Sequence, residues 1–146
     1  MIAGFYFKNT IMNTLTGTWE GTFTYGEDYP QNVIGKSVSF QMKIEEHDGD
    51  LKGSCEDDCL KEFPSKIVGF VDEDFVSIIK TYAYHTGFDE DGNNVSDPGK
   101  PAHEIHYSGT WNADSIEGVF EFGDNRIFAR AESVYEGGTF IMKKQG

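Results

Sequence analysis

The amino-acid sequence predicts an all-β protein, a single antiparallel up-and-down β-barrel of about eight strands. Apolar and polar residues alternate along most of the chain, which is the spacing of strands with one buried face. The chain has 17 glycines among 146 residues and 14% aromatic residues, a composition that favours strands and tight turns over helix bundles. Because sequential antiparallel strands leave open edges unless the sheet closes on itself, we expect a closed barrel.

The length and apolar content of the chain predict one folded domain. A chain of 146 residues with 38% hydrophobic residues can bury a core of its own. We place the β-barrel domain at residues 15–146 and an N-terminal arm at residues 1–14. The apolar stretch from Met1 to Phe7 is a short packing arm, unless translation starts at Met12.

The charge of the chain argues against two classes of partner. The formal net charge is −13 and the cations do not cluster, so we expect neither nucleic acid nor an anionic membrane surface as a partner. No apolar run approaches the roughly 20 residues of a membrane helix. The chain shows no secretory signal, and Cys55 and Cys59 are too few for a disulfide scaffold, so we expect a cytoplasmic protein. Nothing in the sequence indicates an oligomeric state.

The first three strands follow from the alternation and from one turn signal. Residues 15–25 place Trp19 on one face and threonines on the other. Residues 37–45 repeat this pattern. The segment Asp48-Gly49 is a strong hairpin signal, and it leads into a third strand at residues 51–55.

The remaining five strands continue the alternation around one long loop. The fourth strand, near residues 66–71, is short and its inner face is ambiguous, whereas the fifth, residues 75–84, turns Lys80 and its even-numbered neighbours inward. A polar, turn-rich segment at residues 87–101 predicts a mobile loop that serves as a lid. The last three strands are expected at residues 102–112, 116–122 and 137–144.

The start of the first strand resembles a known superfamily. The segment Leu15-Thr16-Gly17-Thr18-Trp19 resembles the Gly-x-Trp opening of the calycins, which include lipocalins, fatty-acid-binding proteins and avidins. The resemblance implies a lipocalin-like barrel in which Trp19 plugs the closed end and a Lys of the last strand, Lys143 or Lys144, lies across it by a cation–π contact. Together with the following residues to Gly26, the opening is similar to small bacterial lipocalin-like proteins, a resemblance that implies the fold and no activity.

Several short motifs lack residues that their chemistry requires. Gly35-Lys36-Ser37 has Pro30 where a P-loop needs glycine, and a strand follows it instead of a helix. The acidic segment at residues 89–94 lacks the glycine and the final glutamate of a calcium loop. His103 and His106 lie three residues apart, so they face opposite sides of a strand. We therefore expect no metal site and no cofactor, and the sequence contains no known catalytic signature.

The strand directions gather polar inward residues at one end of the barrel, which we call the mouth. The odd-numbered strands end there and the even-numbered strands begin there. The opposite end is an apolar plug around Trp19. Barrel mouths are common ligand sites. The candidate ligand-binding residues at the mouth are Tyr25, Asp57, Lys80, Tyr82, Tyr84, His103 and Tyr107.

Three functions fit these residues. An inward Lys80 is costly unless it is paired or solvated, so the polar residues either line a cavity or form an internal network in which Lys80 is tied to Asp57. The first function is a small-molecule-binding barrel whose ligand is partly apolar and meets Lys80 through a polar or acidic group. The alternative is a barrel filled by its own side chains that serves as a structural or protein-interaction module. The third is an enzyme with His103 or Asp57 as general base beside Tyr82.

Overall fold

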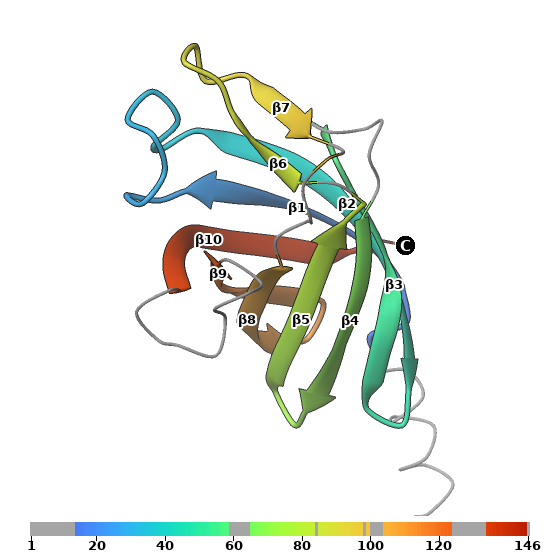
Figure 1. Cartoon of the computed structure of the whole chain (residues 1–146). Helices are drawn as coiled ribbons and strands as arrows, with labels where there is room; N and C mark the ends of the chain where they lie inside the picture. The colour runs from blue at the N-terminus through green and yellow to red at the C-terminus, as the bar shows by residue number, and fades with distance from the viewer. Residues whose placement is uncertain are drawn as a thin grey trace, which may run out of the picture.

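In the computed structural model of the chain, eight antiparallel strands close into a barrel, and two further strands form a separate small sheet (Figure 1). The structure describes residues 14–58, 65–83, 85–97, 99, 104–123 and 134–145. The predicted fold class is confirmed. Of the predicted N-terminal arm, only Thr14 lies within the described residues.

Barrel strands that are neighbours in space follow one another along the chain, so the barrel is an up-and-down meander. Its order is β1-β10-β9-β8-β5-β4-β3-β2, and β10 closes it by pairing with β1. The barrel strands are β1 Gly17–Tyr25, β2 Ser37–His47, β3 Asp50–Asp57, β4 Ser65–Asp72, β5 Phe75–Tyr82, β8 Glu104–Asn112, β9 Ser115–Gly123 and β10 Val134–Lys144. The small sheet consists of β6 His85–Phe88 and β7 Asn94–Asp97.

The alternation of apolar and polar residues decides which side chains enter the barrel. In every barrel strand except β4, residues of predicted inward parity supply buried side chains, and together these form one core. On β4, where the sequence left the inner face open, Ser65 and Ile67 are buried. Val68 and Phe70 of the same strand point outward, with exposed fractions of 54% and 46%. The outward residues of β4 are as apolar as its inward ones, which is why its pattern was ambiguous.

Trp19 closes one end of the barrel, as expected. Its side chain has no exposed surface, and its Nε1 donates a hydrogen bond to the carbonyl of Leu15 at 2.9 Å. Lys144 is the residue of β10 that lies opposite Trp19. Its Nζ donates to the carbonyl of Thr14 at 2.9 Å. The ammonium therefore ties the chain that enters β1 to the last strand.

Two glycines make room for inward aromatic rings. A Cβ on Gly21 of β1 would lie 2.7 Å from Cζ of Phe40, and one on Gly109 of β8 would lie 3.0 Å from Cζ of Phe140. Each ring occupies the space that a side chain on its glycine would need. Glycine inside these strands thus allows large rings to fill a narrow barrel.

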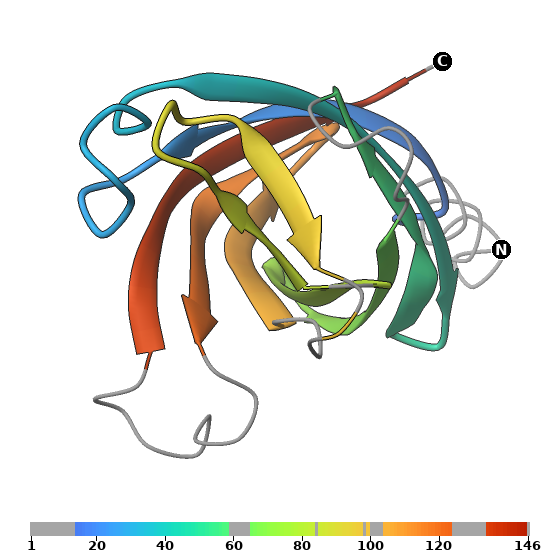
Figure 2. The same cartoon turned by 45° about the horizontal axis from the view of Figure 1, so that its top comes forward.

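The prediction of a mobile loop with almost no apolar anchors at residues 87–101 was wrong in part. Residues 85–97 hold a hairpin, in which β6 pairs with β7 and the Asp89 carboxylate accepts two main-chain N–H bonds at 2.9 Å. Phe88 is the missing anchor, because its ring packs on Tyr25 with centroids 5.3 Å apart. With the top of the barrel brought forward, the hairpin lies across the mouth (Figure 2).

Replacing Trp19 by alanine is expected to lower the free energy of unfolding by about 3 to 5 kcal/mol, because it opens a cavity at the closed end. Trp111→Ala is a matched control, since Trp111 is only partly buried and its Nε1 binds the carbonyl of Ala113 at an exposed position. We expect its loss to be less than half as large. Urea unfolding of both variants measures the difference. A loss below about 1 kcal/mol for Trp19→Ala contradicts the plug role.

Candidate functional site

An ion pair between Lys80 of β5 and Asp57 of β3 lies inside the barrel near the mouth. Nζ of Lys80 is 3.2 Å from Oδ1 and 3.0 Å from Oδ2 of Asp57, so it reaches both carboxylate oxygens. The two side chains are 1% and 0% exposed. Their strands are separated by β4, and both residues take the inward parity of their strand. The sequence alternative in which Lys80 is tied to Asp57 is the arrangement in the structure.

Three aromatic rings surround the ammonium group of Lys80. Nζ lies 5.1 Å from the ring centroid of Phe23, 5.0 Å from that of Tyr82 and 5.1 Å from that of Tyr107. Phe23 belongs to β1, on the opposite side of the barrel from β5, so the ammonium occupies the middle of the barrel. The hydroxyl of Tyr82 donates a hydrogen bond to Oδ2 of Asp57. Ring faces and carboxylate together replace the water that the charge loses on burial.

The protonation states of the cluster follow from burial and from its own charges. Burial alone lowers the pKa of Lys80, but the ring faces of Tyr107 and Tyr82 and the Asp57 carboxylate stabilise the ammonium, and the pKa of Lys80 lies well above its ordinary value. Burial raises the pKa of Tyr82 and that of Tyr107, so both phenols keep their protons at neutral pH. Lys80 is therefore charged, and Asp57, whose two oxygens lie 3.2 and 3.0 Å from its Nζ, is its counterion within the chain.

Cys55 and Ser65 form a second row behind Asp57. Sγ of Cys55 donates to Oδ1 of Asp57 at 3.5 Å, and Oγ of Ser65 donates to the carbonyl of Cys55 at 3.0 Å. Burial raises the pKa of the Cys55 thiol to about 12. The thiol is thus neutral and buried at physiological pH, which makes it a poor nucleophile. Sequence reasoning missed Ser65 because the inner face of β4 was ambiguous.

The predicted site residues separate into two groups. Asp57, Lys80, Tyr82 and Tyr107 form the cluster around the ion pair. Tyr25 belongs to an adjoining aromatic group whose ring centroids are 4.6 to 5.7 Å apart; the group consists of Tyr25, Tyr29, Phe88 and Phe122. The Tyr25 ring also packs on Phe23 of the cluster, with centroids 5.3 Å apart. Tyr84 and His103 lie outside the described residues. The enzyme hypothesis that depends on His103 stays a prediction.

Aromatic rings fill the middle of the barrel beside the ion pair. Phe40 of β2 and Tyr107 of β8 come from opposite sides of the barrel, and their ring centroids are 6.5 Å apart. Phe120 bridges between Phe23 and Tyr107, with centroid distances of 5.5 Å to each. The central layer is therefore occupied by the chain's own side chains.

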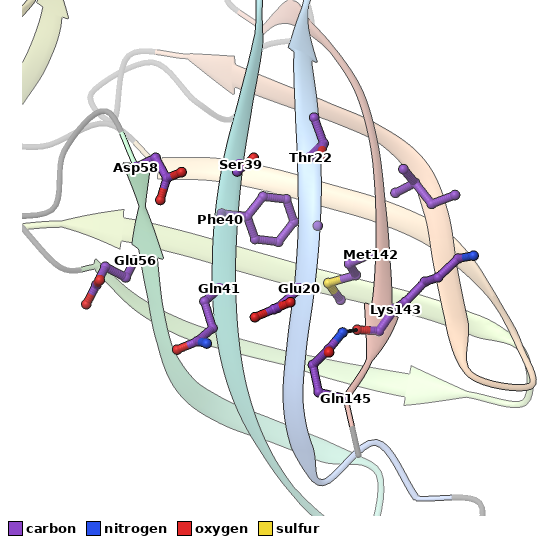
Figure 3. Close-up of a pocket in the computed structure, with 12 residues that line it drawn as sticks. Glu20, Thr22, Ser39, Phe40, Gln41, Glu56, Asp58, Met142, Lys143 and Gln145 are labelled. Carbon is purple, nitrogen blue, oxygen red and sulfur yellow. Dashed lines mark hydrogen bonds between the residues drawn. The ribbon is translucent and has the colours of Figure 1, made fainter.

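Three hollows lined by described residues lie on the outside of the barrel. The groove in Figure 3 measures about 680 Å³ and crosses β1, between outward side chains of β2 and β3 on one side and of β10 on the other. Glu20 lies at its centre, and Lys143 points away from it (Figure 3). A second hollow of about 550 Å³ lies over β8, β9, β10 and β1, and a third of about 380 Å³ at the β2–β3 turn. All three lie away from the buried ion pair.

Comparison with known proteins adds no assignment. No family model, no curated protein and no solved structure matches the chain. In the part of the chain that the structure describes, no three His, Cys, Asp or Glu side chains are grouped so that they could hold a metal ion. No helix among the described residues is long and apolar enough to cross a membrane.

Replacing Lys80 by methionine is expected to lower the free energy of unfolding by about 3 to 5 kcal/mol, because it leaves the Asp57 carboxylate buried without its cation. The double variant Lys80→Met/Asp57→Asn removes both charges and is expected to regain most of the loss. Thermal and urea unfolding of the two variants measure this. A double variant as unstable as the single one would show that the loss comes from packing and not from the unpaired charge.

Alkaline pH is expected to destabilise the fold through Cys55. The pKa of its thiol is 9.0 when unperturbed and about 12 in the folded chain. Between these values the folded chain holds a proton that the unfolded chain has lost, so stability falls as the pH rises, by up to about 1.4 kcal/mol per pH unit for this group. Urea unfolding between pH 8 and 10.5 should show a shallower decline in Cys55→Ala, and equal slopes would contradict the shift.

Proposed function

We propose that this barrel binds a small, partly apolar molecule at the mouth, with the polar group of the ligand directed at the cluster of Asp57, Lys80 and Tyr82. Solvent exposure of the inward side chains supports this position. Tyr25 and Tyr82 at the mouth are 8% and 7% exposed, whereas Trp19 at the opposite end is fully buried. An approaching ligand therefore meets tyrosines before it meets the aromatic layer of the core.

The single observation that carries the proposal is the buried ion pair. Removing two charges from water costs more than packing apolar side chains of similar size, and exchanging a buried pair for such side chains is often neutral or stabilising. A barrel that only had to be stable would do as well with an apolar pair at positions 57 and 80. Buried ionisable groups with shifted pKa values, as here for Lys80 and Tyr82, gather at functional sites.

The β6–β7 hairpin supports a covered site at the mouth. Its contacts with the barrel side include Phe88 on Tyr25 and Tyr29 and a hydrogen bond from Nδ2 of Asn32 to the carbonyl of Glu90 at 3.1 Å. The two strands bond to each other and to no barrel strand. A hairpin held at its tip in this way can lift without breaking the barrel, which would give a ligand access.

We also propose that the barrel is related to the calycins. The meander order and the closed eight-stranded sheet support this relation, as does Trp19 at the closed end with Lys144 opposite it. The acidic net charge of −13 favours a small molecule over nucleic acid or an anionic membrane as the partner. We also propose that the protein is cytoplasmic.

Ligand binding is tested on the full chain as purified. Native mass spectrometry is expected to show a retained small molecule, and the neutral apolar dye N-phenyl-1-naphthylamine is expected to bind with one-to-one saturation. Tyr25→Ala, which removes a mouth ring, should weaken dye binding at least tenfold. Thr22→Ala, on the outer face of the same strand, should leave it unchanged. No retained mass together with no saturable dye binding would contradict the proposal.

A second candidate function is a barrel without a ligand that serves as a structural or protein-interaction module. The filled central layer favours this candidate, since Phe40 and Tyr107 meet across the barrel at 6.5 Å. The two candidates differ in what happens at the mouth. If the barrel binds a ligand, the chain without the β6–β7 hairpin keeps its fold and exchanges the dye. If the barrel is filled and has no site, neither the full chain nor the chain without the hairpin gives a dye signal.

A further inference from the structure

We propose that the mouth site selects an uncharged alcohol group and discriminates against a carboxylate or phosphate. This inference rests on the proposed small-molecule binding and names the chemical class of the ligand. The sequence left open whether a polar or an acidic group of the ligand meets Lys80, and the inference selects an uncharged polar group.

The charge of Lys80 is already neutralised within the chain. Its Nζ reaches both oxygens of Asp57, at 3.2 and 3.0 Å. An incoming carboxylate near Lys80 would therefore also lie near a like charge, in a region from which water is excluded. The attraction to one partner and the repulsion from the other largely cancel, and the cost of removing the acid from water is left uncompensated.

Within the described residues no second lysine is buried at the mouth. Lys36 lies at this end, in the connection between β1 and β2, but its side chain is exposed, and Lys144 sits at the closed end beside Thr14. Lys80 is thus the one described cation on the inner face near the mouth. An acidic head group that reached the cluster would meet no other buried cation among the described residues.

Tyr82 supplies a group that suits an alcohol. Its hydroxyl proton is committed to Oδ2 of Asp57, and the phenol oxygen keeps the capacity to accept a hydrogen bond. An alcohol can donate to that oxygen, whereas an ionised carboxylate has no proton to donate. The aromatic group of Tyr25, Tyr29 and Phe88 at the same end suits an apolar chain.

The test compares 1-octanol with octanoate, which share an alkyl chain and differ in the head group. Isothermal titration calorimetry of the full chain at pH 7.5 is expected to give at least tenfold tighter binding for the alcohol. Equal or tighter binding of octanoate overturns the inference and leaves the proposed binding function standing. Binding of neither compound, with no dye binding, overturns the proposed function and this inference with it.

Variants at the ion pair test the cause of the selectivity. Asp57→Asn frees the charge of Lys80 and should improve octanoate binding at least tenfold, and the neutral double variant Asp57→Asn/Lys80→Met should lose that gain. If Asp57→Asn does not fold, Tyr82→Phe decides, because it keeps the ion pair and removes the accepting oxygen. It should weaken octanol at least tenfold and leave octanoate unchanged. Unchanged octanol binding in Tyr82→Phe overturns the inference.

Discussion

The ion pair of Lys80 and Asp57 restricts the barrel more tightly than any apolar contact does. An apolar side chain can be repacked, but a buried charge must find its counterion at hydrogen-bond distance. Lys80 is on β5 and Asp57 on β3, with β4 between them. A slip of one residue in either pairing would turn one of the two side chains outward and leave the other unpaired. The pair therefore selects the register of three consecutive strands.

The aromatic core is arranged around this pair. Phe23 reaches the ammonium from across the barrel, and its ring also contacts Phe40 and Phe120, so the ion pair and the apolar filling share one layer. A barrel of eight strands is narrow, and large rings find room beside a glycine on the same side of the barrel, as Phe40 does beside Gly21 of the adjacent strand and Phe140 beside Gly109 two strands away. Ring packing thus depends on these two glycine positions, and the ion pair meets the packed rings through Phe23 and Tyr107.

Strand parity made much of this predictable. Alternation alone placed Lys80, Tyr82 and Tyr107 on the inner face. Successive side chains of a strand point to opposite faces, so once the apolar residues of a strand are buried, every second residue is inward as well. It could not predict that Nζ reaches both Asp57 oxygens, since that distance depends on strands that are not paired with each other. The hairpin at residues 85–97 escaped prediction because its strands are four residues long and rich in glycine, asparagine and aspartate, which are turn residues.

The same interaction links stability to ligand choice in the proposed function. Asp57 lowers the cost of burying Lys80, and in doing so it removes the positive potential that would attract an acid. Replacing Asp57 by a neutral residue would leave the positive charge of Lys80 free to attract an acid. The same replacement would remove the counterion that lowers the cost of burying Lys80. Selectivity for charge is thus coupled to the fold at this site. Selectivity for ligand shape falls to the mouth rings, because Tyr25 and Tyr29 pack against Phe88. Tyr25 also packs against Phe23, whose ring lies beside the ammonium, so the mouth rings and the ion pair adjoin each other.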